Sequence, residues 1–83
     1  MNVIKYRVTV SFDLPCMKDG YTRRECTSMQ DEVISSSGAS PEIVWRITRS
    51  MSAVSCLATR FDVLLLQSCD KVISVTEEQI NHI

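Results

Sequence analysis

The sequence predicts a small α+β domain: a three-stranded antiparallel sheet with two helices on one face, in the order β-α-α-β-β-α. Three observations predict this class. Residues 4–14 alternate between apolar and polar side chains, which is typical of a strand with one buried and one solvated face. Two later segments begin with helix-capping signals, and the four consecutive apolar residues Val63–Leu66 are typical of a short buried strand. With 83 residues, the chain is expected to form one domain over residues 1–83.

The first helix is predicted over residues 22–36. Thr22 and Glu25 stand at capping-box spacing, so each side chain can accept a hydrogen bond from a free amide at the helix start. Gly38 suits the left-handed position that follows a helix end. The apolar stripe of this helix is expected to consist of three side chains, Cys26, Met29 and Val33.

A second helix is predicted to begin at Ser40-Pro41-Glu42, which supplies a cap, a proline at the first helical position and a carboxylate near the positive end of the helix dipole. Apolar side chains then recur at spacings of three and four, which is typical of an amphipathic helix. These side chains are Val44, Ile47, Met51, Val54 and Ala58.

The last part of the chain is predicted to form a hairpin followed by a short helix. Its two strands are expected over Phe61–Gln67 and Lys71–Val75, with a turn between them. Thr76 and Gln79 repeat the capping-box spacing and predict a terminal helix that carries Ile80 and Ile83.

The residue types that carry catalysis show no spacing typical of an active site. The one histidine, His82, is next to the last residue, and a base must be held firmly to catalyse proton transfer. The four cysteines show no C-x₂₋₄-C pair of the kind that zinc sites use, and they are expected to be reduced thiols. Cys16 and Cys69 fall in predicted turns, where a neighbouring base would make them reactive. We therefore predict no catalytic, cofactor-binding or metal-binding residue and no enzymatic activity.

The charge balance gives no excess that would attract a polyanion, because nine Lys and Arg stand against ten Asp and Glu. The longest apolar run is four residues, which is far too short to span a membrane. The first residues alternate instead of forming the apolar core of a signal peptide. These features predict a cytoplasmic protein.

Two features indicate a protein partner. On the predicted second helix, Trp45 falls opposite the apolar stripe and Arg49 lies four residues further on, over the indole face. Exposed Trp beside Arg is typical of interface hot spots; the alternative is that Trp45 packs against the first helix or the terminal segment. Leu64 and Leu66 are predicted on the outer face of the sheet, as an apolar patch that needs a cover. Either the terminal helix or a partner protein would supply that cover.

The predicted partner-binding residues are therefore Trp45, Arg49, Leu64 and Leu66. The expected function is that of a non-enzymatic protein-binding module: a homodimer, or a small regulator or inhibitor that occupies the surface of a larger protein.

The alternative is a nucleic-acid-binding domain, because the order β-α-α-β-β-α resembles that of KH domains. The resemblance departs at residues 35–40, which hold one glycine and no basic residue where a KH domain has the G-x-x-G loop that clamps the nucleic-acid backbone. Under this alternative, six basic side chains would converge on one face: Lys18, Arg23, Arg24, Arg46, Arg49 and Arg60.

Overall fold

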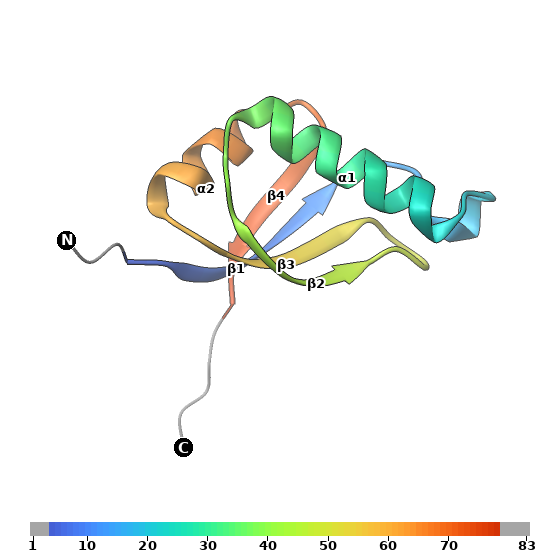
Figure 1. The fold of residues 1–83 in the computed structure, drawn as a ribbon, viewed down its shortest axis with the longest axis horizontal. Helices are drawn as coiled ribbons and strands as arrows, with labels where there is room; N and C mark the ends of the chain where they lie inside the picture. The colour runs from blue at the N-terminus through green and yellow to red at the C-terminus, as the bar shows by residue number, and fades with distance from the viewer. Residues whose placement is uncertain (1–3, 79–83) are drawn as a thin grey trace, which may run out of the picture.

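The computed structural model describes residues 4–78 as a four-stranded antiparallel sheet with two helices on one of its faces (Figure 1). The strands lie in the order β2-β3-β1-β4. The elements, in chain order, are β1 (Tyr6–Phe12), the 3₁₀ turn η1 (Met17–Asp19), α1 (Arg23–Ser37), β2 (Glu42–Ile47), β3 (Ala53–Ala58), α2 (Arg60–Gln67) and β4 (Val72–Glu77).

The predicted α+β class, with an antiparallel sheet and two helices on one face, is confirmed (Figure 1). The predicted number of strands and the order β-α-α-β-β-α are wrong, because the sheet has four strands and the order is β-α-β-β-α-β. This order, with the first and third strands at the centre of the sheet, is that of the ferredoxin-like, or split βαβ, topology.

The first strand and the first helix form as predicted. The inward side chains of β1, Val8, Val10 and Phe12, are at most 3% exposed. At the start of α1, the Glu25 amide donates to the Thr22 hydroxyl over 3.1 Å and the Thr22 amide donates to the Glu25 carboxylate over 3.0 Å. The helix ends at Gly38, whose φ of 82° is in the left-handed region that favours glycine.

The buried face of α1 is turned by one residue from the predicted stripe. Its buried side chains are Cys26, Gln30 and Ile34. The predicted stripe residues Met29 and Val33 are only half-buried. The apolar stripe therefore marks the flank of the helix, and a polar side chain, Gln30, takes a central place in the contact with the sheet.

The segment predicted as the second helix is a β-hairpin. β2 and β3 pair antiparallel, with Ile43 opposite Cys56 and Arg46 opposite Val54. Pro41 therefore precedes an edge strand instead of starting a helix, and this is a position where proline removes no hydrogen bond from the interior of a sheet.

The segment predicted as the second strand is the helix α2. Thr59 caps it: the Asp62 amide donates to the Thr59 hydroxyl and the Thr59 amide donates to the Asp62 carboxylate, both over 3.1 Å. The Ser40 amide also donates to Asp62, over 3.2 Å, and so ties α2 to the start of the hairpin. The predicted extended conformation of Val63–Leu66 is wrong.

The last predicted strand is present as β4, which pairs with β1 at the sheet edge. Thr76 and Glu77 belong to this strand, so the predicted helix start at Thr76 is wrong. The remainder of that predicted helix, residues 79–83, lies outside the described residues. Neither α1 nor α2, the helices of the described chain, is long and apolar enough to cross a membrane.

Candidate functional site

Trp45 lies on the edge strand β2 and is 66% exposed. Its partner across the ladder is Ser55, which pairs in turn with Thr9 on β1. Val8 and Val10, on either side of Thr9, are buried beneath the helices. Trp45 therefore faces the open side of the sheet, away from α1 and α2. The predicted exposure of Trp45 is confirmed, although the predicted helix that would carry it is wrong.

A hollow of about 330 Å³ lies beside Trp45 at the end of β2. We call it the Trp45 groove. Residues from η1, from the first turn of α1, and from β2 and the turn after it form its lining: Met17, Arg23, Trp45, Arg46, Ile47, Thr48 and Arg49. Three of these residues are arginines, and none of the described lining residues is acidic.

Backbone hydrogen bonds hold the two rims of the groove together. The amide of Met17 donates to the Thr48 carbonyl over 2.7 Å, and the amide of Lys18 donates to the Arg49 carbonyl over 2.9 Å. The Thr48 hydroxyl also lies 3.4 Å from the sulfur of Met17. These contacts fix η1 against the turn between β2 and β3, so the backbone around the groove is held in place by the fold itself.

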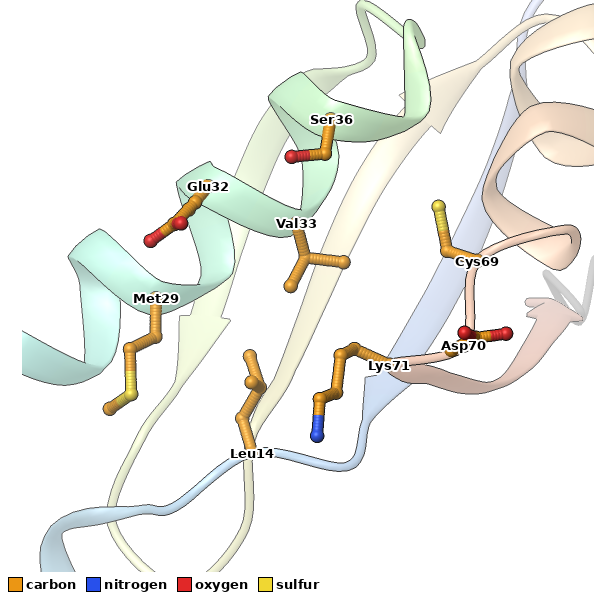
Figure 2. Close-up of a pocket in the computed structure, with 8 residues that line it drawn as sticks. All are labelled: Leu14, Met29, Glu32, Val33, Ser36, Cys69, Asp70 and Lys71. Atoms are coloured by element: carbon orange, nitrogen blue, oxygen red, sulfur yellow. The ribbon is translucent and has the colours of Figure 1, made fainter.

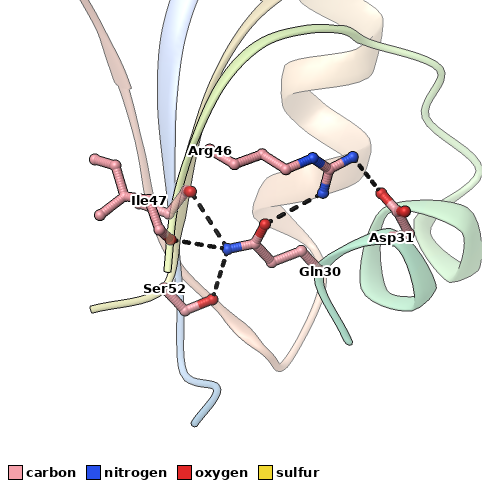
Figure 3. Close-up of polar contacts among 6 residues, drawn as sticks. Gln30, Asp31, Arg46, Ile47 and Ser52 are labelled. Carbon is pink, nitrogen blue, oxygen red and sulfur yellow. Dashed lines mark hydrogen bonds and ion pairs between the residues drawn. The ribbon is translucent and has the colours of Figure 1, made fainter. Parts of the chain in front are cut away.

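A buried amide network positions the floor of the groove (Figure 3). The Gln30 side chain, fully buried, donates from Nε2 to the carbonyls of Ile47 and Ala53 and to the hydroxyl of Ser52, over 3.0–3.3 Å. Its Oε1 accepts from Arg46 over 3.2 Å. Gln30 thus attaches both ends of the β2–β3 turn to α1.

The three arginines of the groove differ in their partners. Arg46 forms an ion pair with Asp31 of α1, with 2.6 Å between the guanidinium nitrogen and the carboxylate oxygen (Figure 3). Within residues 4–78, neither Arg23 nor Arg49 is in an ion pair. The groove therefore keeps two cationic side chains that no carboxylate of the described chain neutralises.

Trp45 and Arg49, which were predicted to lie side by side on a helix, do line the same groove, but their arrangement differs from the prediction. Arg49 lies in the turn after β2, and the described cation–π contact is between Arg60 and the ring of Tyr6, at 5.6 Å from the centroid. Arg49 over the Trp45 indole is thus not the arrangement found in residues 4–78.

The other two predicted partner-binding residues, Leu64 and Leu66, lie in different surroundings. Leu64 is 57% exposed on α2, beside the exposed Phe61 one turn before it. Leu66 is fully buried in the core between α2 and the sheet. The predicted patch of Leu64 and Leu66 on one sheet face is therefore wrong, because three and four residues, not two, bring side chains to one side of a helix.

The six basic residues of the nucleic-acid alternative converge only in part. Arg23, Arg46 and Arg49 share the Trp45 groove. Arg24 lines a different hollow beside Tyr21, and Arg60 lies over Tyr6. Lys18 is exposed on η1 and is not in the lining of the groove. The element order that resembled a KH domain is also wrong.

The open face of the sheet carries a polar network beside Trp45. The hydroxyls of Ser55 and Thr9 both donate to the Glu78 carboxylate, which also pairs with Arg7 over 3.3 Å. The hydrogen bond from Ser55 lowers the pKa of Glu78 most, the bond from Thr9 and the charge of Arg7 add to it, and burial opposes them. A carboxylate that stays ionised therefore lies over the two central strands.

Sequence reasoning missed a second hollow, of about 360 Å³, between α1 and the loop that leads into β4. Figure 2 shows half-buried apolar side chains of Leu14, Met29 and Val33 in it, with Lys71 reaching into the same space. Glu32 and Asp70 are also in its lining, so its charged groups have both signs. The signal in the sequence was the stripe of Met29 and Val33, which stays half-buried beside the core.

All four cysteines lie in the described chain and are free thiols. Burial raises the pKa of Cys26, and it raises that of Cys56 to about 11. The Cys16 thiol donates to Asp19 over 3.4 Å, and the Cys69 thiol donates to the Leu65 carbonyl over 3.7 Å. Among residues 4–78, no group of three or more His, Cys, Asp or Glu is placed to hold a metal ion.

In comparisons with protein families, curated proteins and solved structures, the chain matches none of them.

Proposed function

We propose that this protein is a non-enzymatic, cytoplasmic protein-binding module that acts by occupying the surface of a larger target protein through the Trp45 groove. The observation that carries this proposal is the exposed Trp45 in a preformed hollow whose charged lining residues are all arginines. Tryptophan and arginine are the residues most enriched at the energetic centres of protein interfaces. The four free thiols support a reducing compartment.

The fixed backbone of the groove supports a role in binding. Both rims are fixed by backbone hydrogen bonds, and Gln30 fixes the turn from below. A partner that binds there does not have to order the backbone of the site, since that backbone is already held in place.

The charge of the groove favours a different protein over a second copy at this site. A symmetric dimer joins the same surface patch of two copies. Two Trp45 grooves facing each other would bring the unpaired arginines of one copy, Arg23 and Arg49, close to those of the other, and like charges held together oppose association. A homodimer would instead use the exposed Phe61 and Leu64 on α2.

Affinity capture from the native host tests the proposal, with Trp45→Ala compared with wild type. Phe61→Ala is the matched control, because it also removes an exposed aromatic side chain, from the helix layer. We expect a protein that wild type and Phe61→Ala retain and Trp45→Ala loses. Equal retention by all three would refute the proposal.

Light scattering separates the homodimer from the larger target. We expect the 9.4 kDa mass of a monomer for wild type and for Leu64→Asp. A wild-type mass of twice this value that returns to 9.4 kDa in Leu64→Asp would favour the homodimer.

A further inference from the structure

We infer that the Trp45 groove binds an acidic linear segment of the target protein, in which carboxylates flank an apolar side chain. This inference rests on the proposed function and names the chemistry of the partner.

The charge of the groove selects carboxylates. Arg23 and Arg49 line it without an ion pair in the described chain, while Arg46 is already held by Asp31. A guanidinium donates two parallel hydrogen bonds to one carboxylate, so each free arginine offers a site for one acidic side chain. The protein as a whole has a net charge of −1, so the cationic character is local to this groove.

The apolar surface of the groove selects a hydrophobic side chain between those carboxylates. Trp45 is 66% exposed and Met17 is 37% exposed, and Ile47 is half-buried beside them. An indole ring and a flexible thioether adapt to aliphatic and aromatic partners alike. The groove therefore combines one apolar contact surface with two cationic ones.

The position of the groove suits an extended chain. β2 is an outer strand of the sheet, and the outer edge of such a strand presents backbone donors and acceptors that its own sheet leaves open. The Ile47 carbonyl at the end of β2 is already bonded to Gln30, so the open groups lie before it. An extended peptide beside β2 can form backbone hydrogen bonds there while its side chains reach Trp45 and Arg49.

Glu78 favours a protein over a nucleic acid. Its ionised carboxylate accepts from Ser55, and Ser55 is the cross-strand partner of Trp45. A nucleic-acid strand carries a phosphate at every nucleotide, so one that followed the open sheet face from Trp45 would bring negative charge to Glu78, whereas a peptide can place an uncharged residue there. The outward side chains of the central strands beside it, Arg7, Thr9 and Ser55, also offer no aromatic ring on which a base could stack.

Selection from a random dodecapeptide display library on the immobilised protein tests the inference. Peptides that also bind Trp45→Ala are removed, and the remainder are synthesised with a fluorescein label and titrated by fluorescence polarisation. We expect selected sequences with Asp or Glu on both sides of an apolar residue. We expect their affinity to fall about tenfold or more in the double variant Arg23→Gln/Arg49→Gln, since two charge-assisted contacts are lost.

Arg24→Gln is the matched control, because Arg24 follows Arg23 on α1 but lines a different hollow. Its affinity should stay within about twofold of wild type, while the salt dependence of binding should weaken only in the double variant. Thermal unfolding of each variant confirms that it is folded.

Three results would overturn the inference. Trp45-dependent peptides without acidic enrichment would refute the acidic partner and leave the proposed function standing. Absence of any Trp45-dependent peptide would refute a linear segment, and host capture with Trp45→Ala would then decide the proposed function separately. A fluorescein-labelled single-stranded oligonucleotide that binds more tightly than every selected peptide would assign the groove to a nucleic acid.

Discussion

Replacement of Gln30 by methionine tests how α1 holds the β2–β3 turn and, through it, the Trp45 groove. Methionine keeps the length of the side chain and removes its amide. In the native protein this amide reaches three acceptors, Ile47, Ser52 and Ala53, and accepts from Arg46, while Gln30 is fully buried. The substitution therefore removes polar contacts with little change in packing volume.

The expected loss follows from the number of hydrogen bonds. Gln30 Nε2 carries two protons, and each hydrogen bond contributes about 1 kcal/mol net, which gives about 2 kcal/mol. Loss of the acceptor for Arg46 adds about 1 kcal/mol, which is less than is usual for a charged group because Arg46 keeps its ion pair with Asp31. The free energy of unfolding should thus fall by about 3 kcal/mol, out of roughly 5–15 kcal/mol for a domain. At this size the melting temperature should fall by roughly 15 °C.

Urea unfolding followed by tryptophan fluorescence measures this loss, since Trp45 is the one tryptophan. Gln67→Met is the matched control, because Gln67 is exposed on α2, and it should change the free energy of unfolding by less than about 0.5 kcal/mol. Equal stability of the Gln30 and Gln67 variants would refute the role given to the buried amide.

Three further perturbations follow from the fold. Leu66→Ala should lower the free energy of unfolding by about 3 kcal/mol through the cavity it leaves, whereas Leu64→Ala, at an exposed site, should change it little. Equal losses of this free energy in urea unfolding would contradict the different burial of the two side chains. Because the pKa of Glu78 is lowered in the folded protein, its contribution is complete above its ordinary pKa near 4.5 and is lost as the pH falls through the folded value. Glu78→Gln should therefore be less stable than wild type at pH 7, and this difference should shrink as the pH falls below about 4.5. A difference that stays constant as the pH falls would contradict the network. Gly38→Ala should lower the free energy of unfolding by about 1 kcal/mol, because a φ of 82° is unfavourable for alanine. A Cβ would have room there, since the nearest side-chain atom, on Leu65, is at 3.9 Å. An unchanged melting temperature would refute this backbone strain.

The first half of the fold could be predicted because its signals are local and agree with one another. The alternation in residues 4–14 and the capping box at Thr22 each match what forms. The β2–β3 hairpin could not be recognised in the same way. Its turn, residues 48–52, contains no glycine, proline or asparagine, and β3 is buried at five of its six positions, so it shows no alternation. The apolar residues of this segment recur at spacings of three and four, which is the pattern of an amphipathic helix, and this led to the wrong prediction.

The α2 segment was ambiguous for a different reason. Four consecutive apolar residues fit either a buried strand or a short helix, and the decisive signal was the cap of Thr59 with Asp62.

For the candidate site, the sequence predicted some of the residues but not their arrangement in space. An exposed Trp45 and a nearby Arg49 were inferred from the sequence, but Arg23 and Met17 join them through the tertiary fold, which brings η1 against the β2–β3 turn.

The order of the strands also determines how quickly the chain can reach its native state. The two central strands, β1 and β3, come from distant parts of the sequence: Arg7 and Ser55, in contact across them, are 48 positions apart. A long loop must close before these two residues can come into contact, and the entropy lost in this closure slows folding. We expect refolding on the millisecond scale or slower, which is slower than for helical bundles of equal length. The local β2–β3 hairpin can form before the two central strands pair.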